Sequence, residues 1–353
     1  MQNSSTLSTA SSRAASVTVG EIACAGKGDT LLPEVAGLEA LWRRYVHGDA
    51  APDARPMAER VLLDMLGLGN VQTIRQLLDE RPSFADFRAW IVATAGAPDP
   101  VRLARYHHWY RGDPLPPEAA AMLAAIDAAL PVLSAENLAQ WDEQGFVILR
   151  AAIDADAAAA VAGLVWDAVG GSPDDPASWG DDALEGIMIP RFQHPLLEVA
   201  RRSPRVHEAF AQLWGTADLW TTIDRLGFNP PLATGRPFRG SPLHWDVSLA
   251  TPIPFSTQGV LYLTDTTADQ GAFQLVPGFH HRIEQWLHDL GDADPRAIDL
   301  SAQAVRVPGK AGDLIIWRQD LPHGASPNRS ARPRLVQYLT MYSPDQEVQP
   351  IWR

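Results

Sequence analysis

The second half of the chain is a series of short apolar segments separated by turn residues, and this pattern constrains the fold most. Together with one earlier segment they are Phe146–Leu149, Leu219–Phe228, Leu243–Leu249, Gln258–Leu263, Ala272–Val276, Ala304–Val307, Leu314–Trp317 and Leu335–Tyr342. Segments of this length and spacing are typical of antiparallel sandwiches and jelly-roll barrels. No strand–helix–strand alternation and no glycine-rich phosphate loop interrupts them. We therefore predict a mainly β core with flanking helices.

Residues 31–130 instead carry apolar residues at helical spacing. In "LPEVAGLEALWRRYVHGD", Val35, Leu38 and Leu41 recur every three or four positions, which places them on one face of a helix. The same spacing occurs in "PMAERVLLDMLGLG", "NVQTIRQLLDERPSFADFRAWIVATAG" and "PPEAAAMLAAIDAALPVL". We predict a helical module of unknown role over residues 31–130 and a separate domain over residues 133–353.

The charge of the chain restricts its partners. The 353 residues include 29 Lys and Arg against 42 Asp and Glu, a net charge of −13, without the basic clusters of nucleic-acid-binding proteins. An acidic surface also disfavours anionic membranes, and no apolar run approaches the length of a transmembrane helix. We expect a small-molecule substrate, no nucleic acid and no membrane, and we leave a homo-oligomer open.

Cysteine usage and the composition of the N-terminal residues bear on location. Cys24 is the single cysteine, so an internal disulfide and a thiolate metal cluster are excluded, and a reducing cytoplasm fits best. Residues 1–30 are rich in Ser, Thr, Ala and Gly and lack the apolar core of a secretion signal. Because they contain little apolar surface to bury, we predict a disordered tail.

The stretch "SPLHWDVSL" places His244 and Asp246 two residues apart. In an extended strand these two side chains point to the same side, which suits a metal ion and equally suits a surface hydrogen bond. The same spacing recurs at His47 and Asp49, but Gly48 between them indicates a helix end, where a histidine complements the helix dipole. We therefore consider only the first pair as a metal site.

A metal site at His244 and Asp246 needs a third ligand, and His323 in "GDLIIWRQDLPHGASPN" is the best candidate. Two imidazoles and one carboxylate on one face of an octahedron leave neighbouring positions open, as in non-haem Fe(II) oxygenases. An anionic co-substrate would need a cationic partner, and Arg334 could grip a carboxylate in a two-point salt bridge. Arg332 has the same strand parity, so the choice between the two arginines stays open.

These residues resemble a known family. The segments "HWD", "DQGAFQLVPGFHH" and "GDLIIW…PHGASPN", followed by Arg334, look like the phytanoyl-CoA dioxygenase family, and "WDEQGFVILRAAI" is similar to the start of its domain. The resemblance extends over residues 133–342. It implies a double-stranded β-helix, which is a cupin-like jelly roll, and an oxygenase that uses Fe(II), 2-oxoglutarate and O2.

The resemblance also implies roles for individual residues. His244, Asp246 and His323 match the iron ligands, and Arg334 matches the position that binds the 5-carboxylate of 2-oxoglutarate. We add Gln258 and Ser326 as further co-substrate contacts; Ser326 follows Ala325, which replaces a small hydroxyl residue of some members. Related halogenating enzymes lack the carboxylate that Asp246 supplies here, so hydroxylation is favoured, with succinate and CO2 as co-products.

The substrate is the least readable part of the sequence. Trp245 and Trp317 flank the ligands, and Arg236 and Arg239 precede them, so we take these four as candidate substrate contacts. A natural product, an amino acid or a lipid-like molecule would fit, with a role in secondary metabolism. Two alternatives stay open: a metal-dependent hydrolase or isomerase with the same ligands, and a non-catalytic metal-binding jelly roll.

Overall fold

A computed structural model describes residues 32–50, 55–179, 186–232 and 238–353. Residues 31–353 form one compact unit. The predicted tail over residues 1–30, Cys24 within it and the substrate candidate Arg236 lie outside the described residues. The proposed boundary between the helical module and the domain that follows stays a prediction.

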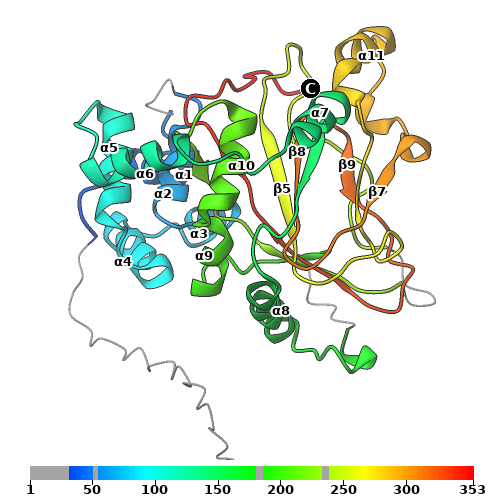
Figure 1. Ribbon diagram of the computed structural model, residues 1–353. Coiled ribbons are helices and arrows are strands. Elements are labelled where there is room, and N and C mark those ends of the chain that lie inside the picture. The colour runs from blue at the N-terminus through cyan, green and yellow to red at the C-terminus, as the bar shows by residue number, and fades with distance from the viewer. Residues whose placement is uncertain (1–31, 51–54, 180–185, 233–237) are drawn as a thin grey trace, which may run out of the picture. The chain divides into compact units, whose positions relative to one another are not determined.

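Helices α1 to α6 make up most of the described part of the segment that the sequence predicts as helical (Figure 1). They are α1 (Leu38–His47), α2 (Ala58–Met65), α3 (Asn70–Glu80), α4 (Phe84–Ala95), α5 (Pro100–Arg111) and α6 (Pro117–Asp127). Apolar side chains from α1 to α5 pack into one core cluster, whereas Ile126 of α6 packs with Ala211 and Ala217. Helix α1 ends at Gly48, whose φ of 78° is the left-handed conformation that glycine adopts without strain, and this confirms the predicted helix end.

The stretch predicted as continuous between residues 70 and 95 is two helices. Arg81 adopts a left-handed φ of 44° and ends α3, and Pro82 follows it. Ser83 then caps α4, because its side chain accepts a hydrogen bond from the amide of Asp86. The remaining helices are α7 (Ala135–Gln144), α8 (Ala155–Val169), α9 (Pro195–Arg201), α10 (Pro204–Trp214) and α11 (Ile283–Leu290).

The strands of the described residues form two main antiparallel sheets. One has the order β1-β8-β5-β10-β4-β2 and the other β7-β6-β9, while β11 and β3 pair separately. The strands are β1 (Phe146–Leu149), β2 (Met188–Ile189), β3 (Trp220–Thr221), β4 (Leu226–Asn229), β5 (Thr257–Tyr262), β6 (Phe273–Leu275), β7 (Val305–Val307), β8 (Leu314–Arg318), β9 (His323–Ala325), β10 (Arg334–Tyr338) and β11 (Met341–Tyr342).

The two sheets enclose a hydrophobic core, which confirms the jelly-roll prediction. Val260 and Ile315 of the larger sheet share one cluster with Phe273, Leu275 and Val307 of the smaller sheet. The intervening residues of the larger sheet, such as those at 261 and 314, pack on the other face against α8 and α10. Alternate residues of β5 and β8 therefore serve two different cores, as the period of two in a strand requires.

Three predicted segments differ from the observed strands. Leu243–Leu249 is irregular apart from an isolated bridge between His244 and His323. Leu219–Phe228 divides into β3 and β4, and Leu335–Tyr342 divides into β10 and β11. Strands β2 and β9 were not predicted, because two or three residues carry no readable periodicity and pair only through long-range contacts.

A buried carboxylate on α2 links the helical segment to the β core through hydrogen bonds. Asp64, which is 2% exposed, accepts hydrogen bonds from the Tyr342 hydroxyl at 2.7 Å and from the backbone amide of Ile223 at 2.8 Å. Arg105 of α5 adds a bond to the Leu219 carbonyl at 2.8 Å. None of the described helices is both long enough and apolar enough to span a membrane.

Candidate metal and co-substrate site

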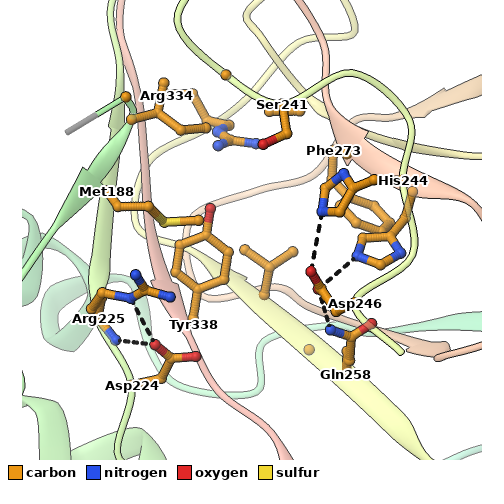
Figure 2. A pocket seen from close by; sticks show the side chains of 18 of the residues that line it. Met188, Asp224, Arg225, Ser241, His244, Asp246, Gln258, Phe273, Arg334 and Tyr338 are labelled. Atoms are coloured by element: carbon orange, nitrogen blue, oxygen red, sulfur yellow. Dashed lines mark hydrogen bonds and ion pairs between the residues drawn. The ribbon is translucent and has the colours of Figure 1, made fainter. Parts of the chain in front are cut away.

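A cavity of about 290 Å³ contains the residues that the sequence singles out. His244, Asp246 and Gln258 lie on one side of it, and Met188 and Arg225 lie on the opposite side (Figure 2). Arg334 and Ser241 lie along a third side, with the Tyr338 ring between the groups. The candidate metal triad and Arg334, the candidate partner for a co-substrate carboxylate, therefore line the same cavity.

The three candidate ligands converge on one point. One atom from each of His244, Asp246 and His323 lies within 4.8 Å of the other two. The Nε2 atom of His244 is 3.3 Å from Oδ1 of Asp246, and Nε2 of His323 is 3.2 Å from Oδ2. His323 is 5% exposed at its side chain, whereas Asp246 is 51% exposed, so the cluster opens towards solvent on the carboxylate side.

Backbone carbonyls fix the tautomer of both histidines. Nδ1 of His244 lies 2.8 Å from the carbonyl oxygen of Pro242, and Nδ1 of His323 lies 3.0 Å from that of Leu321. A carbonyl oxygen only accepts hydrogen bonds, so each Nδ1 carries the proton. Both Nε2 atoms are therefore the nitrogens available for a metal, in the arrangement typical of metal-ligating histidines.

This arrangement brings two imidazole nitrogens and a carboxylate close together, and a cation between them would stabilise it. Burial disfavours the charged form of the His244 imidazole. Hydrogen bonds with Asp246 and with the Pro242 carbonyl outweigh this effect and raise the pKa of His244 above 6.5. Burial likewise favours the neutral acid at Asp246, but hydrogen bonds with His244 and His323 hold the pKa of that carboxyl well below its usual range. A proton or a metal ion stabilises the same contacts, and two imidazoles with one carboxylate fit a divalent iron.

Gln258 holds the carboxylate of Asp246. Its Nε2 donates to Oδ2 of Asp246 at 2.7 Å, and its Oε1 accepts from the indole N–H of Trp317 at 3.2 Å. The indole has only a donor to offer, so it fixes which end of the amide faces Asp246. With Oδ2 bonded to the amide, Oδ1 is the less encumbered oxygen of the carboxylate.

Arg334 is a buried cation with two unused donor atoms. The residue is 1% exposed, and neither Nε nor Nη2 has a hydrogen-bond partner. Guanidinium donors without partners are costly to bury, and the planar fork of the group matches a carboxylate. Arg332 is exposed and does not line the cavity. The structure thus brings Arg334, and not Arg332, to the cavity wall.

Comparison with known proteins identifies the family. The sequence profile described as "Phytanoyl-CoA dioxygenase (PhyH)" matches residues 141–336, more than half of the chain. The chain belongs to this family. Its members are non-haem iron oxygenases that depend on Fe(II), 2-oxoglutarate and O2, so the predicted family, enzyme class and cofactors are confirmed at that level.

Several named proteins are similar to this chain. An ectoine dioxygenase of Bordetella parapertussis is 23% identical over 247 residues, which cover 62% of this chain and 78% of the relative. The carbocyclase SnoK from nogalamycin biosynthesis is 19% identical with a TM-score of 0.44, covering 63% of this chain and 90% of SnoK. EctD from S. alaskensis is 20% identical with a TM-score of 0.44, covering 62% and 79%.

Of the remaining site residues that the sequence suggests, some line the cavity and others do not. Trp317 and Arg239 line the cavity. Trp245 does not: it is 4% exposed and donates to the carbonyl of Asp320 at 3.0 Å, because its neighbours on both sides face the cavity and it points into the core. Ser326 is fully buried and lies outside the cavity lining, where Ala325 takes the wall position.

Sequence reasoning missed several cavity residues. Tyr338 lies four positions after Arg334 on β10, so the period of two could have placed both on one face. Met188, Asp224 and Arg225 also line the cavity. They lie in short or irregular segments, and no local pattern in the sequence marks them.

Proposed function

We propose that this protein is an Fe(II)- and 2-oxoglutarate-dependent dioxygenase that hydroxylates an unactivated C–H bond of a small molecule. His244, Asp246 and His323 would hold the iron, and Arg334 would bind the distal carboxylate of 2-oxoglutarate. Residues 133–353 would form the catalytic domain. The proposal extends the family assignment to the reaction and to individual residues.

One observation carries the proposal: a preformed triad and a buried arginine with two unused donor atoms line the same cavity. Both histidines present Nε2 because carbonyls hold their Nδ1 protons. The donors of Arg334 that lack partners supply the positive charge that a dianionic keto acid needs. A hydrolase with the same metal ligands would have no use for this second feature.

The residues of the chain supply placement, while the cofactors supply oxidation. Bound at the triad, Fe(II) with 2-oxoglutarate and O2 would provide the oxidising power for C–H hydroxylation, with succinate and CO2 as co-products. Gln258 keeps the Asp246 carboxylate in one orientation. The rings of Phe273 and Trp317 line the same cavity and exclude water from the reacting atoms.

Size and charge support a small molecule as the substrate. The cavity of about 290 Å³ is at the lower end of the range for small-molecule sites, which starts at about 300 Å³. The net charge of −13 argues against a nucleic-acid partner. The single cysteine supports a reducing cytoplasm as the location.

Anaerobic titration tests this function. Adding 2-oxoglutarate to the Fe(II)-loaded protein should produce the weak visible charge-transfer band of the chelate, and admitting O2 should produce succinate. A hydrolase, an isomerase or an inert metal-binding jelly roll would give no band with the keto acid. Mass spectrometry of products from a panel of amino acids, lipids and natural products would then identify the hydroxylated substrate.

A further inference from the structure

A second cavity, of about 360 Å³, adjoins the catalytic cavity. It lies between the helical segment and the residues around β2, and we call it the helix chamber. Its lining consists of Val71, Gln76 and Trp90, of Gln72, Arg75, Asp79 and Glu80, and of Met188, Pro190, Phe192 and Arg225. The first three belong to α3 and α4, outside the part of the chain that the family profile matches.

The helix chamber and the catalytic cavity meet at two side chains. Met188 and Arg225 line both spaces. In Figure 2 these two residues lie across the cavity from His244 and Asp246. A molecule with its reacting carbon at the metal triad that is long enough to cross the cavity would reach Met188 and Arg225, the two side chains that also line the helix chamber.

The lining of the helix chamber indicates what kind of group fits. Trp90, Phe192 and Met188 offer an apolar wall, which suits an aromatic or alkyl group. Gln72, Arg75, Asp79 and Glu80 supply polar and charged groups around it. At the junction, Nε of Arg225 donates to Oδ1 of Asp224 at 3.2 Å. The terminal nitrogens of Arg225 form no hydrogen bond with a residue that the structure describes, so they can bind an acidic group.

Contacts from the helical segment hold this junction in place. Asp64 of α2 accepts a hydrogen bond from the backbone amide of Ile223 at 2.8 Å. On the other side, Arg201 donates to the backbone carbonyl of Asp224 at 2.8 Å. The backbone that carries Arg225 is thus fixed from two elements, which favours a preformed binding site over a chance gap.

We propose that the helix chamber binds the remote part of an elongated substrate, an aromatic or alkyl group, while Arg225 binds an acidic group at the junction. This inference rests on the proposed oxygenase function and assigns a role to the helical segment. The substrate class is an amphipathic acid too long for the catalytic cavity alone.

A groove along the C-terminal residues also reaches Asp246 and Gln258. Its amide groups are largely engaged within the chain: Gln349 donates to the carbonyls of Ala250 and Pro252, and Gln319 donates to the carbonyl of Pro254. Because these donors already hold the groove together, fewer remain for a ligand. The helix chamber is the better candidate.

Binding of 8-anilinonaphthalene-1-sulfonate, an aromatic acid of suitable shape, tests the proposal. The full chain, loaded with Fe(II) and 2-oxoglutarate without O2, is titrated by fluorescence. We compare Gln76→Trp, which fills the helix chamber, with Leu78→Trp as the matched control. Leu78 is on the same helix, 45% exposed and outside the chamber lining. Arg225→Gln removes the proposed acid-binding group, and it is the second test variant in case Gln76→Trp fails to fold.

We expect saturable binding in the wild type and the control, and a dissociation constant raised by about tenfold or more in Gln76→Trp and Arg225→Gln. Equal binding in all variants, or no saturable binding in the wild type, would overturn the proposal. Trp352 lines the C-terminal groove, so loss of binding in Trp352→Ala but not in Gln76→Trp or Arg225→Gln would place the probe there and overturn the proposal. The charge-transfer band of the wild type is recorded in parallel, and its absence would contradict the oxygenase function rather than the chamber.

Discussion

The backbones of His244 and His323 are hydrogen-bonded to each other in both directions. The amide of His244 donates to the carbonyl of His323 at 2.9 Å, and the amide of His323 donates back at 3.0 Å. This isolated bridge joins an irregular segment to β9. The spacing of the two imidazoles is therefore set by the backbone before any metal binds, as a preorganised site requires.

Removing any ligand of the triad should abolish the function. We expect His244→Ala, Asp246→Ala and His323→Ala to lose the charge-transfer band and succinate formation, because two ligands hold Fe(II) poorly. His47→Ala is the control, since that residue belongs to the other His-x-Asp sequence, at the end of α1. Full succinate formation by one of the three variants would exclude that residue as a ligand.

Gln258 should influence the metal through Asp246. We expect Gln258→Met to lower Fe(II) affinity by about 10–100-fold, the range for residues that orient metal ligands. Trp317→Phe keeps an aromatic ring but loses the indole N–H, so its effect should be smaller. Calorimetric titration with Co(II) as a redox-stable substitute measures both, with Gln285→Met on α11 as the control. Unchanged affinity in Gln258→Met would show that the hydrogen bond to Asp246 has no such role.

The two arginines near β10 should differ sharply. Arg334→Gln should raise the 2-oxoglutarate concentration needed for the band by about 100-fold or more, because it removes a charged two-point contact. Iron binding should persist, which Co(II) titration checks. Arg332→Gln should behave as the wild type, since Arg332 is exposed. The reverse result would assign the carboxylate to Arg332.

Iron binding should weaken as the pH falls. The pKa of His244 is raised above 6.5 in the metal-free protein, so protons compete with the metal below that raised value. The sign is opposite for folding without metal: the protonated His244 stabilises the fold below pH 6.5, and this contribution is lost as the pH rises through the raised pKa. Metal titrations and thermal unfolding between pH 5.5 and 8, with His244→Ala for comparison, measure the two trends. If metal affinity and the stability of the metal-free protein changed in the same direction with pH, the raised pKa of His244 would be contradicted.

The anchor of the helical segment should be essential for stability. Asp64→Ala leaves the Tyr342 hydroxyl, the Ile223 amide and the Arg60 guanidinium without their shared acceptor. We expect a loss of about 3–5 kcal/mol in the free energy of unfolding. Urea denaturation measures it, with the exposed Asp289→Ala as the control. A loss below about 1 kcal/mol, the level of a surface pair, would show that Asp64 is not a structural anchor.

Much of the fold was readable because local patterns report local structure. The helix end at Gly48 and the strand over residues 146–149 were predicted as observed, since a glycine and an apolar run mark them. The segment over residues 243–249 was not, because its conformation depends on pairing with His323 rather than on its own residues.

The sequence by itself determined the types of residue available for chemistry: two histidines, a carboxylate and an arginine in an order that resembles one family. Only the tertiary structure decided that Arg334 rather than Arg332 reaches the cavity, that Trp245 faces the core, and that Gln258 bonds to Asp246. The physical reason is the separation along the chain of the residues whose contacts decide each feature. Helix caps and strand periodicity depend on neighbours in the chain, whereas burial and hydrogen-bond partners depend on which distant strands come together.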